Sequence, residues 1–150
     1  MKLAEALIER ADLQKRIESL NSRLCSNARV QDGDTPAEDP FLLLEELDHC
    51  SARLEEIVCR INLTNTAVVV DGKTITAWIA HRDSLTKKVT IMRDFLCCAS
   101  QIGPRSTKNE ILIRPSVPVA EIQKSVDLLS RELRETDTKI QAANWTTDLL

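Results

Sequence analysis

The sequence predicts a mainly α-helical protein, in which four long helices pack as a bundle or antiparallel coiled coil, with a small β-hairpin and a short strand at one end. Four stretches carry apolar residues at alternating gaps of three and four, the repeat of a helix with one apolar face. Glycines number only 3 and aromatic residues only 3%, which is typical of helices around an aliphatic core. At 150 residues we expect one domain, spanning residues 1–150.

The first two helices are separated by a segment of turn-forming residues. The first apolar stripe, called a seam below, predicts a helix over roughly residues 2–27. Segment 31–40 contains Gly, Asp and Pro without periodic apolar residues, so it predicts a loop. Asp39 is a good N-cap before Pro40, and the second helix should run to about Asn65. The first seam comprises Leu3, Ala6, Arg10, Leu13, Ile17, Leu20 and Leu24, and the second comprises Leu44, Leu47, Ser51, Leu54, Val58 and Ile61.

A hairpin and a further strand are predicted between the later helices. Asp71-Gly72 lies between β-branched residues, which predicts a tight hairpin over residues 68–75. Gly103-Pro104 should end the third helix, and residues 111–113 predict a short strand before Pro115. Trp145 follows the last seam and is expected to close one end of the bundle. The third seam comprises Ile75, Trp78, Arg82, Leu85, Val89, Met92, Leu96 and Ala99, and the fourth comprises Val119, Ile122, Val126, Leu129, Leu133, Thr136, Ile140 and Ala143.

Two arginines, Arg10 and Arg82, occupy seam positions among apolar residues. An unpaired charge at such a position costs several kcal/mol, roughly 3–5 when one partner of a buried pair is removed. We therefore expect both guanidinium groups to form ion pairs or to extend toward solvent. The candidate carboxylate partners are Asp12, Asp83, Asp127 and Asp137.

Composition and charge exclude several classes of protein. The net charge of -3 disfavours a nucleic-acid partner. The first residues lack the apolar core of a signal peptide, and no apolar stretch approaches the ~20 residues of a membrane span. The 5 cysteines are odd in number and form no Cys-x-x-Cys motif, so we interpret them as reduced thiols of a cytoplasmic protein.

Segments at both ends of the chain resemble a family of small bacterial proteins, the septicolysin-like family. The resemblance lies in residues 1–14 and 137–145, with further similarity at residues 60–65 and 82–85. It implies a helical fold and a bacterial source, and it implies little chemistry because the family is largely uncharacterised. The family label also suggests a membrane-active, cytolysin-type toxin.

An acidic segment before and at the start of the second helix offers candidates for a metal site, whereas His49, Cys50, His81, Cys97 and Cys98 are suitable zinc ligands in unsuitable spacing. Residues 32–48 contain seven acidic side chains and no Lys or Arg, although their spacing does not fit an EF-hand. Glu45, Glu46 and His49 lie within about one helical turn and are weak candidates for a metal site of a metal-dependent helical hydrolase. The alternative interpretation is a solvated loop and a helix N-terminus, where carboxylates are favoured by the helix dipole.

The sequence thus predicts a non-catalytic, homo-oligomeric helical protein with an interaction or structural role. No nucleophile motif or glycine-rich phosphate loop is present, so we assign no catalytic or cofactor-binding residue and expect no cofactor. The expected partner is a further copy of the chain, with the strands contributing to the contact, because the predicted hairpin and strand leave open sheet edges. In addition, the helices carry apolar residues beside their seams. The two alternatives are the metal-dependent hydrolase and the membrane-active toxin.

Overall fold

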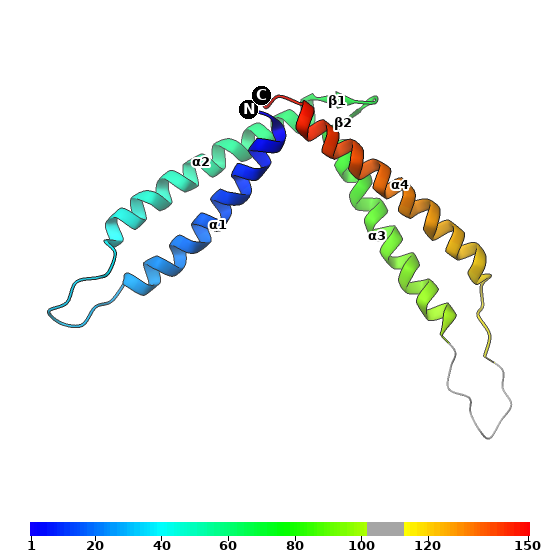
Figure 1. Cartoon of the computed structure of the whole chain (residues 1–150), viewed down its shortest axis with the longest axis horizontal. Coiled ribbons are helices and arrows are strands. Elements are labelled where there is room, and N and C mark those ends of the chain that lie inside the picture. The colour runs from blue at the N-terminus through cyan, green and yellow to red at the C-terminus, as the bar shows by residue number, and fades with distance from the viewer. Residues whose placement is uncertain (102–112) are drawn as a thin grey trace, which may run out of the picture. The chain divides into compact units, whose positions relative to one another are not determined.

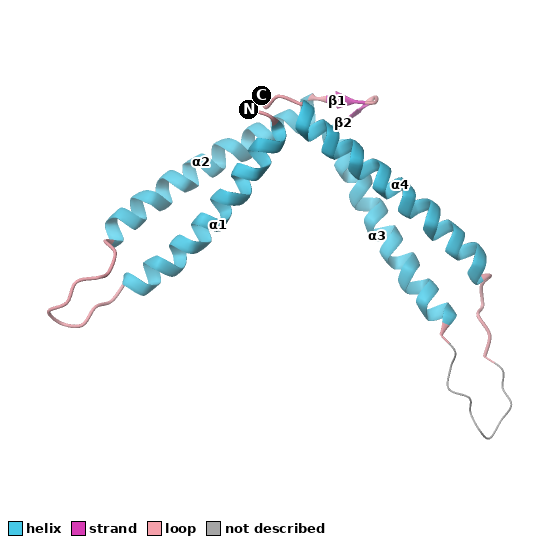
Figure 2. Cartoon of the chain, viewed as in Figure 1, coloured by secondary structure: helices cyan, strands magenta, loops and turns pink. Residues whose placement is uncertain are grey.

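The computed structural model describes residues 1–101 and 113–150. Four helices hold 77% of these described residues, namely α1 (Leu3–Asn27), α2 (Pro40–Ala67), α3 (Ile75–Ser100) and α4 (Val119–Thr146) (Figures 1 and 2). Strands β1 (Val69–Val70) and β2 (Lys73–Thr74) form a two-stranded antiparallel sheet. The predicted class, mainly helical with four long helices and a small hairpin, is confirmed.

The chain divides into two compact units, each with two antiparallel helices lying side by side (Figure 1). The first unit contains α1, α2 and the β-hairpin, as residues Met1–Thr74, together with Ala142–Leu150 at the end of α4. The second unit, Ile75–Gln141, contains α3 and most of α4. Helix α4 runs without a break through both units. The expectation of one domain over residues 1–150 stays a prediction.

The core of the first unit lies between α1 and α2. All seven predicted seam positions of α1 are buried or half-buried, which confirms the first seam. The predicted seam of α2 is wrong in part, because Leu43, Cys50 and Ile57 are buried whereas Leu44 and Ser51 are exposed. The run of three leucines at 42–44 fixes no helical phase by itself, and a buried cysteine behaves as a small apolar residue. The apolar face of α2 is therefore rotated by about one residue at its start.

The ends of the first unit are joined through backbone hydrogen bonds. The amide of Leu3 donates to the carbonyl of Thr147, and the amide of Leu149 donates to the carbonyl of Met1, each at 2.9 Å. The amide of Leu150 donates to Oγ1 of the buried Thr64 at 3.0 Å. The first bond satisfies an amide at the start of α1 that has no partner within the helix, and the other two attach the C-terminal residues to Met1 and α2.

The β-hairpin forms as predicted. Val69 pairs with Thr74 and Val70 pairs with Lys73, so that the two intervening residues make the turn. Asp71 and Gly72 have φ angles of 48° and 80°. Two successive positive φ angles are the signature of a type I′ turn, which Asp-Gly adopts readily because glycine has no Cβ.

The core of the second unit lies along the predicted seams of α3 and α4, and both seams are confirmed as buried or half-buried. The predicted position of Trp145 is wrong, since this side chain is 59% exposed and the adjacent Asn144 is buried instead. Of the predicted strand 111–113, residues 111 and 112 lie outside the described residues, as does Gly103-Pro104. Ile113 is described, does not belong to a strand and is 70% exposed.

Candidate functional site

The candidate site lies on one face of the α1–α2 pair, where ion pairs between the two helices border a shallow groove. Arg16 of α1 binds Glu46 of α2, with 2.6 Å between Nε and Oε1. Arg53 of α2 binds Glu9 of α1 in a bidentate pair, with distances of 2.6 and 3.1 Å. These two pairs fix the antiparallel register of the helices. The hydrogen bonds from Arg53 also lower the pKa of Glu9 below its ordinary value.

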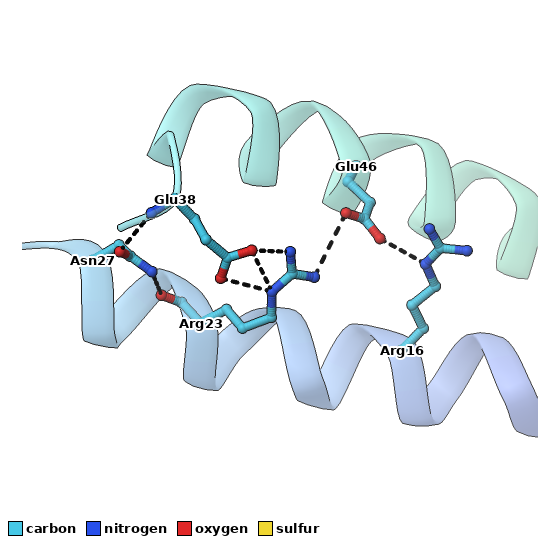
Figure 3. Close-up of polar contacts among 5 residues, drawn as sticks. All are labelled: Arg16, Arg23, Asn27, Glu38 and Glu46. Atoms are coloured by element: carbon cyan, nitrogen blue, oxygen red, sulfur yellow. Dashed lines mark hydrogen bonds and ion pairs between the residues drawn. The ribbon is translucent and has the colours of Figure 1, made fainter. Parts of the chain in front are cut away.

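The loop between α1 and α2 is tied down by a second set of contacts, shown in Figure 3. The guanidinium of Arg23 binds the carboxylate of Glu38 through Nη2 and through Nε, which donates to both oxygens at 3.1 and 3.0 Å. Asn27 bridges the same elements, because its Oδ1 accepts from the amide of Glu38 and its Nδ2 donates to the carbonyl of Arg23. The hydrogen bonds from Arg23 lower the pKa of Glu38. The acidic loop is therefore part of a structural clamp.

The groove consists of two neighbouring depressions that share Leu13 and Arg16 as lining residues. The first, of about 390 Å³, is lined by α1 alone. The second, of about 420 Å³, lies between α1 and α2. Together the two depressions carry an apolar floor and several carboxylates. The first is lined by Glu5, Ile8, Glu9, Asp12, Leu13 and Arg16, and the α2 wall of the second includes Leu42, Glu45, Glu46 and His49.

The three predicted metal ligands, Glu45, Glu46 and His49, all line the second depression. The carboxylate of Glu46 is occupied by two guanidinium groups, with Arg16 at 2.6 Å and Arg23 at 3.7 Å. Across the part of the chain that the structure describes, no group of three or more His, Cys, Asp and Glu side chains is arranged to hold a metal ion. A carboxylate paired with arginine is a poor ligand for a further cation, and the metal site stays a prediction.

Sequence reasoning missed the arginines that face the acidic segment. Arg16 and Arg23 directly precede the seam residues Ile17 and Leu24, so they occupy the positions that flank a heptad seam. Such flanking charges commonly pair across a helix–helix contact. Applied to these arginines and to the acidic residues of α2, the rule would have predicted the ion pairs.

The seam arginines behave differently from each other. Arg82 forms the predicted ion pairs, with Asp83 at 2.8 Å and Asp137 at 4.0 Å. The Nε of Arg10 is buried and has no hydrogen-bond partner within residues 1–101 and 113–150, so the expected pair of Arg10 is not found. A buried donor without a partner is unfavourable, which makes Arg10 a weak point of the first unit.

The second unit has a depression of its own, of about 440 Å³, between α3 and α4. Arg93 of α3 crosses it and donates to Oγ of the buried Ser130 of α4 at 3.0 Å. At another point His81 contacts Glu132 at 3.2 Å, and the ammonium of Lys139 lies 4.8 Å from the centre of the Trp78 ring. These contacts link the two helices through polar side chains.

A family model identifies the relatives of this chain. The model of a family of unknown function, DUF6847, matches residues 10–149. The chain belongs to this family. A conserved protein of unknown function from Corynebacterium diphtheriae, whose crystal structure is solved, is also similar, with 38% identity and a TM-score of 0.89 over 100% of this chain and 99% of that chain. No curated protein matches the chain.

Membership of the DUF6847 family corrects the resemblance to septicolysin-like proteins, for which the comparisons give no support. The terminal segments that carried the resemblance are parts of the long amphipathic helices α1 and α4, and unrelated helical proteins share such Leu-, Ala-, Glu- and Arg-rich patterns. The expectation of a cytolysin-type activity rested on that resemblance and is withdrawn with it. Among the described residues, no helix combines the length and apolar character that a bilayer span requires.

Proposed function

We propose that this member of the DUF6847 family is a non-catalytic helical protein that assembles with further copies of itself and serves an interaction or structural role. The observation that carries the proposal is the exposure of large apolar side chains on all four helices. They include Ile8 on α1, Phe41, Leu42, Leu44 and Leu63 on α2, Ile91 and Phe95 on α3, and Leu128 and Trp145 on α4.

The reason for this exposure is that each helix has one helical neighbour within its unit. A pair of helices buries one stripe on each member, and apolar residues beside that stripe remain in water. Phe41 is 77% exposed and Leu128 is 70% exposed. Exposed apolar side chains in such number favour a protein–protein contact. The β-strands have only two residues each, so the helical faces provide the larger surface.

The polar groups support a non-catalytic role. Around the groove of the first unit, the arginines are engaged with carboxylates of the neighbouring helix. Such pairs position helices and do not leave a poised acid or base. The alternative, a metal-dependent hydrolase, is favoured only by the presence of Glu45, Glu46 and His49 in one depression. The net charge of -3 argues against a nucleic-acid partner.

We place the protein in the cytoplasm as part of the same proposal. All five cysteines are free thiols, and Cys25, Cys59, Cys97 and Cys98 are exposed. Exposed thiols persist in a reducing compartment and oxidise outside it. Alkylation of intact cells followed by mass spectrometry should label the exposed thiols, whereas disulfide-linked peptides from the same cells would contradict this location.

The oligomeric state tests the proposed function directly. Size exclusion coupled to light scattering, at tens of micromolar protein, should give the mass of an oligomer of two or more chains, each of 16.8 kDa. The mass should fall toward that of one chain on dilution if the exposed apolar residues form the contact. A mass of 16.8 kDa at every concentration contradicts the proposal.

A further inference from the structure

The groove on the first unit combines apolar residues with unpaired negative charge. Ile8 is 53% exposed and Leu42 is 62% exposed. Asp12 and Glu45 have no ion-pair partner among the described residues, although other carboxylates of the groove do. The ion pairs set the register of α1 against α2. In this register, at a rise of 1.5 Å per residue, the groove is about 22 Å long from the level of Glu5 to that of Leu42. We call it the acidic groove.

A stripe of opposite character runs along α3 in the second unit. Ser84, Lys88, Ile91, Phe95 and Cys98 recur at gaps of four, three, four and three, so they share one helix face beside the buried seam. All five side chains are exposed, with Ile91 at 67%. We call this face, together with the adjacent Lys87, the basic stripe, and from Ser84 to Cys98 it is about 21 Å long.

The ammonium groups of Lys87 and Lys88 also lack partners. Neither lysine has an ion pair within residues 1–101 and 113–150. Most other cations near the helix contacts are engaged, as Arg16, Arg53 and Arg82 show. The basic stripe therefore presents two free positive charges beside two exposed apolar side chains, Ile91 and Phe95.

We propose that the basic stripe of one copy docks into the acidic groove of a second copy. The inference rests on the proposed self-association and names the two surfaces that meet. Three properties match: the lengths agree, each surface offers apolar side chains to the other, and the unpaired charges are opposite in sign. With Lys87 and Lys88 placed between Asp12 and Glu45, Ile91 and Phe95 would bury against Leu42.

Charge also determines which surfaces can meet. Two acidic grooves facing each other across a twofold axis would bring Asp12 and Glu45 against their own copies, and like charges in contact are repulsive. A groove that receives a stripe avoids this repulsion. Because each copy offers both surfaces, the contact can form twice in a reciprocal twofold dimer or repeat head to tail into a ring or an open chain.

A charge-swap experiment tests the contact. The first variant carries Lys87→Glu and Lys88→Glu, and the second carries Asp12→Lys and Glu45→Lys. Each variant alone should associate at least about tenfold more weakly than the natural chain, because its groove and stripe then have the same sign of charge. Mixing the two variants should restore association, since every stripe then meets a groove of opposite sign.

Three controls define the outcome. Lys124→Glu reverses an exposed charge of α4 outside both surfaces and should leave the oligomer mass unchanged. Circular dichroism of each variant should show unaltered helix content, because the substituted residues are exposed. Because Ile91 is proposed to bury in the groove, Ile91→Asp should also weaken association. Mixing it with the first variant should not rescue association, since both chains then carry an altered stripe.

The inference and the proposed function fail in different ways. A natural chain that is monomeric overturns both. An oligomer that persists in the two charge variants overturns only the groove–stripe contact. Carbodiimide crosslinking of a mixture of light and ¹⁵N-labelled chains should join Lys87 or Lys88 to Asp12 or Glu45 in mixed-isotope peptides, whereas crosslinks confined to peptides of one isotope would also overturn it.

Discussion

The two helix pairs of this chain have the same kind of apolar repeat but pack differently. The Cα traces of α1 and α2 approach within 8 Å over much of their length, whereas those of α3 and α4 do so at very few described positions. In the first pair, Leu20, Leu43 and Cys50 form a buried cluster with neighbouring aliphatic residues. In the second pair, the buried set includes the polar residues Ser130 and Thr136. The shared repeat therefore predicts which faces meet, but not how tightly.

Residues beside the seam account for much of the difference. In the first pair the flanking charges are complementary across the contact, as in Arg16 with Glu46 and Arg53 with Glu9. In the second pair the contacts across the two helices are longer, at 3.2 Å for His81 with Glu132 and 4.0 Å for Arg82 with Asp137, and the 2.8 Å pair of Arg131 with Glu135 lies within α4. Large seam side chains such as Trp78 also increase the distance between helix axes. We infer that the α1–α2 pair is the more stable of the two.

The largest expected effect comes from matched leucine deletions in the two pairs. Leu20→Ala removes a fully buried side chain of the α1–α2 cluster and should lower the free energy of unfolding by about 2–5 kcal/mol. Leu85→Ala in α3 should cost less, within the lower half of that range, because the more open contact leaves a smaller cavity. Urea unfolding followed by circular dichroism measures both changes.

Hydrogen exchange resolves the same comparison by element. Backbone amides of α1 and α2 should be more protected than those of α3 and α4 in the natural chain, and Leu20→Ala should reduce protection chiefly in the first pair. Equal protection of all four helices, together with equal costs for the two leucine deletions, would show that the difference in backbone spacing has no energetic consequence.

Acid should weaken the first pair through Glu9. The pKa of Glu9 is lowered from its ordinary value of 4.5 by hydrogen bonds from Arg53. A lowered pKa in the folded state means that the interaction stabilises the fold above the ordinary pKa and is lost as the pH falls through the lowered value. Glu9→Gln should therefore lower the urea midpoint at pH 7 and have little effect near pH 2.

The matched control for this acid effect is Glu135→Gln, which removes an exposed carboxylate paired with Arg131 within α4. It should shift the midpoint at pH 7 less than Glu9→Gln does, because the pair joins no second helix. A deficit of Glu9→Gln that is the same at both pH values would show that the loss is one of packing rather than of charge.

Much of the fold was predictable because the apolar repeat dictates which faces are buried. The seams of α1, α3 and α4, the loop before Pro40 and the Asp71-Gly72 turn all follow from local patterns. The phase at the start of α2 was not predictable, since leucines at 42, 43 and 44 are equally apolar and only contact with α1 selects Leu43. The exposure of Trp145 also depends on neighbours distant in sequence.

The site was less predictable than the fold. Glu46 was chosen as a metal ligand because it lies in an acidic run, but its charge is balanced by Arg16 and Arg23 from another helix. Partners of this kind are 23 or more residues away in the chain, and a local pattern does not contain them. Complementary charges of the groove and the stripe became apparent only when burial showed which side chains remain exposed.

A smaller effect is expected at Arg82, the paired seam arginine. Its side chain is 32% exposed and its partners Asp83 and Asp137 are more than half exposed. Ion pairs in such surroundings are screened by water, so Arg82→Ala should cost about 0.2–1 kcal/mol in urea unfolding. Asp137→Asn tests the longer contact separately. A loss above about 2 kcal/mol for Arg82→Ala would show that the stem of the side chain contributes to the α3–α4 packing.

The smallest effect is expected at His49, and it bears on the alternative of a metal-dependent hydrolase. His49 is exposed, so His49→Ala should change the free energy of unfolding by less than about 0.5 kcal/mol. Protein purified without added metal should contain no stoichiometric zinc, because the neighbouring carboxylate of Glu46 is bound by arginines. Elemental analysis measures this content. One zinc per chain that disappears in His49→Ala, with a large loss of stability, would instead place a metal between α1 and α2 and favour the hydrolase over the assembly protein.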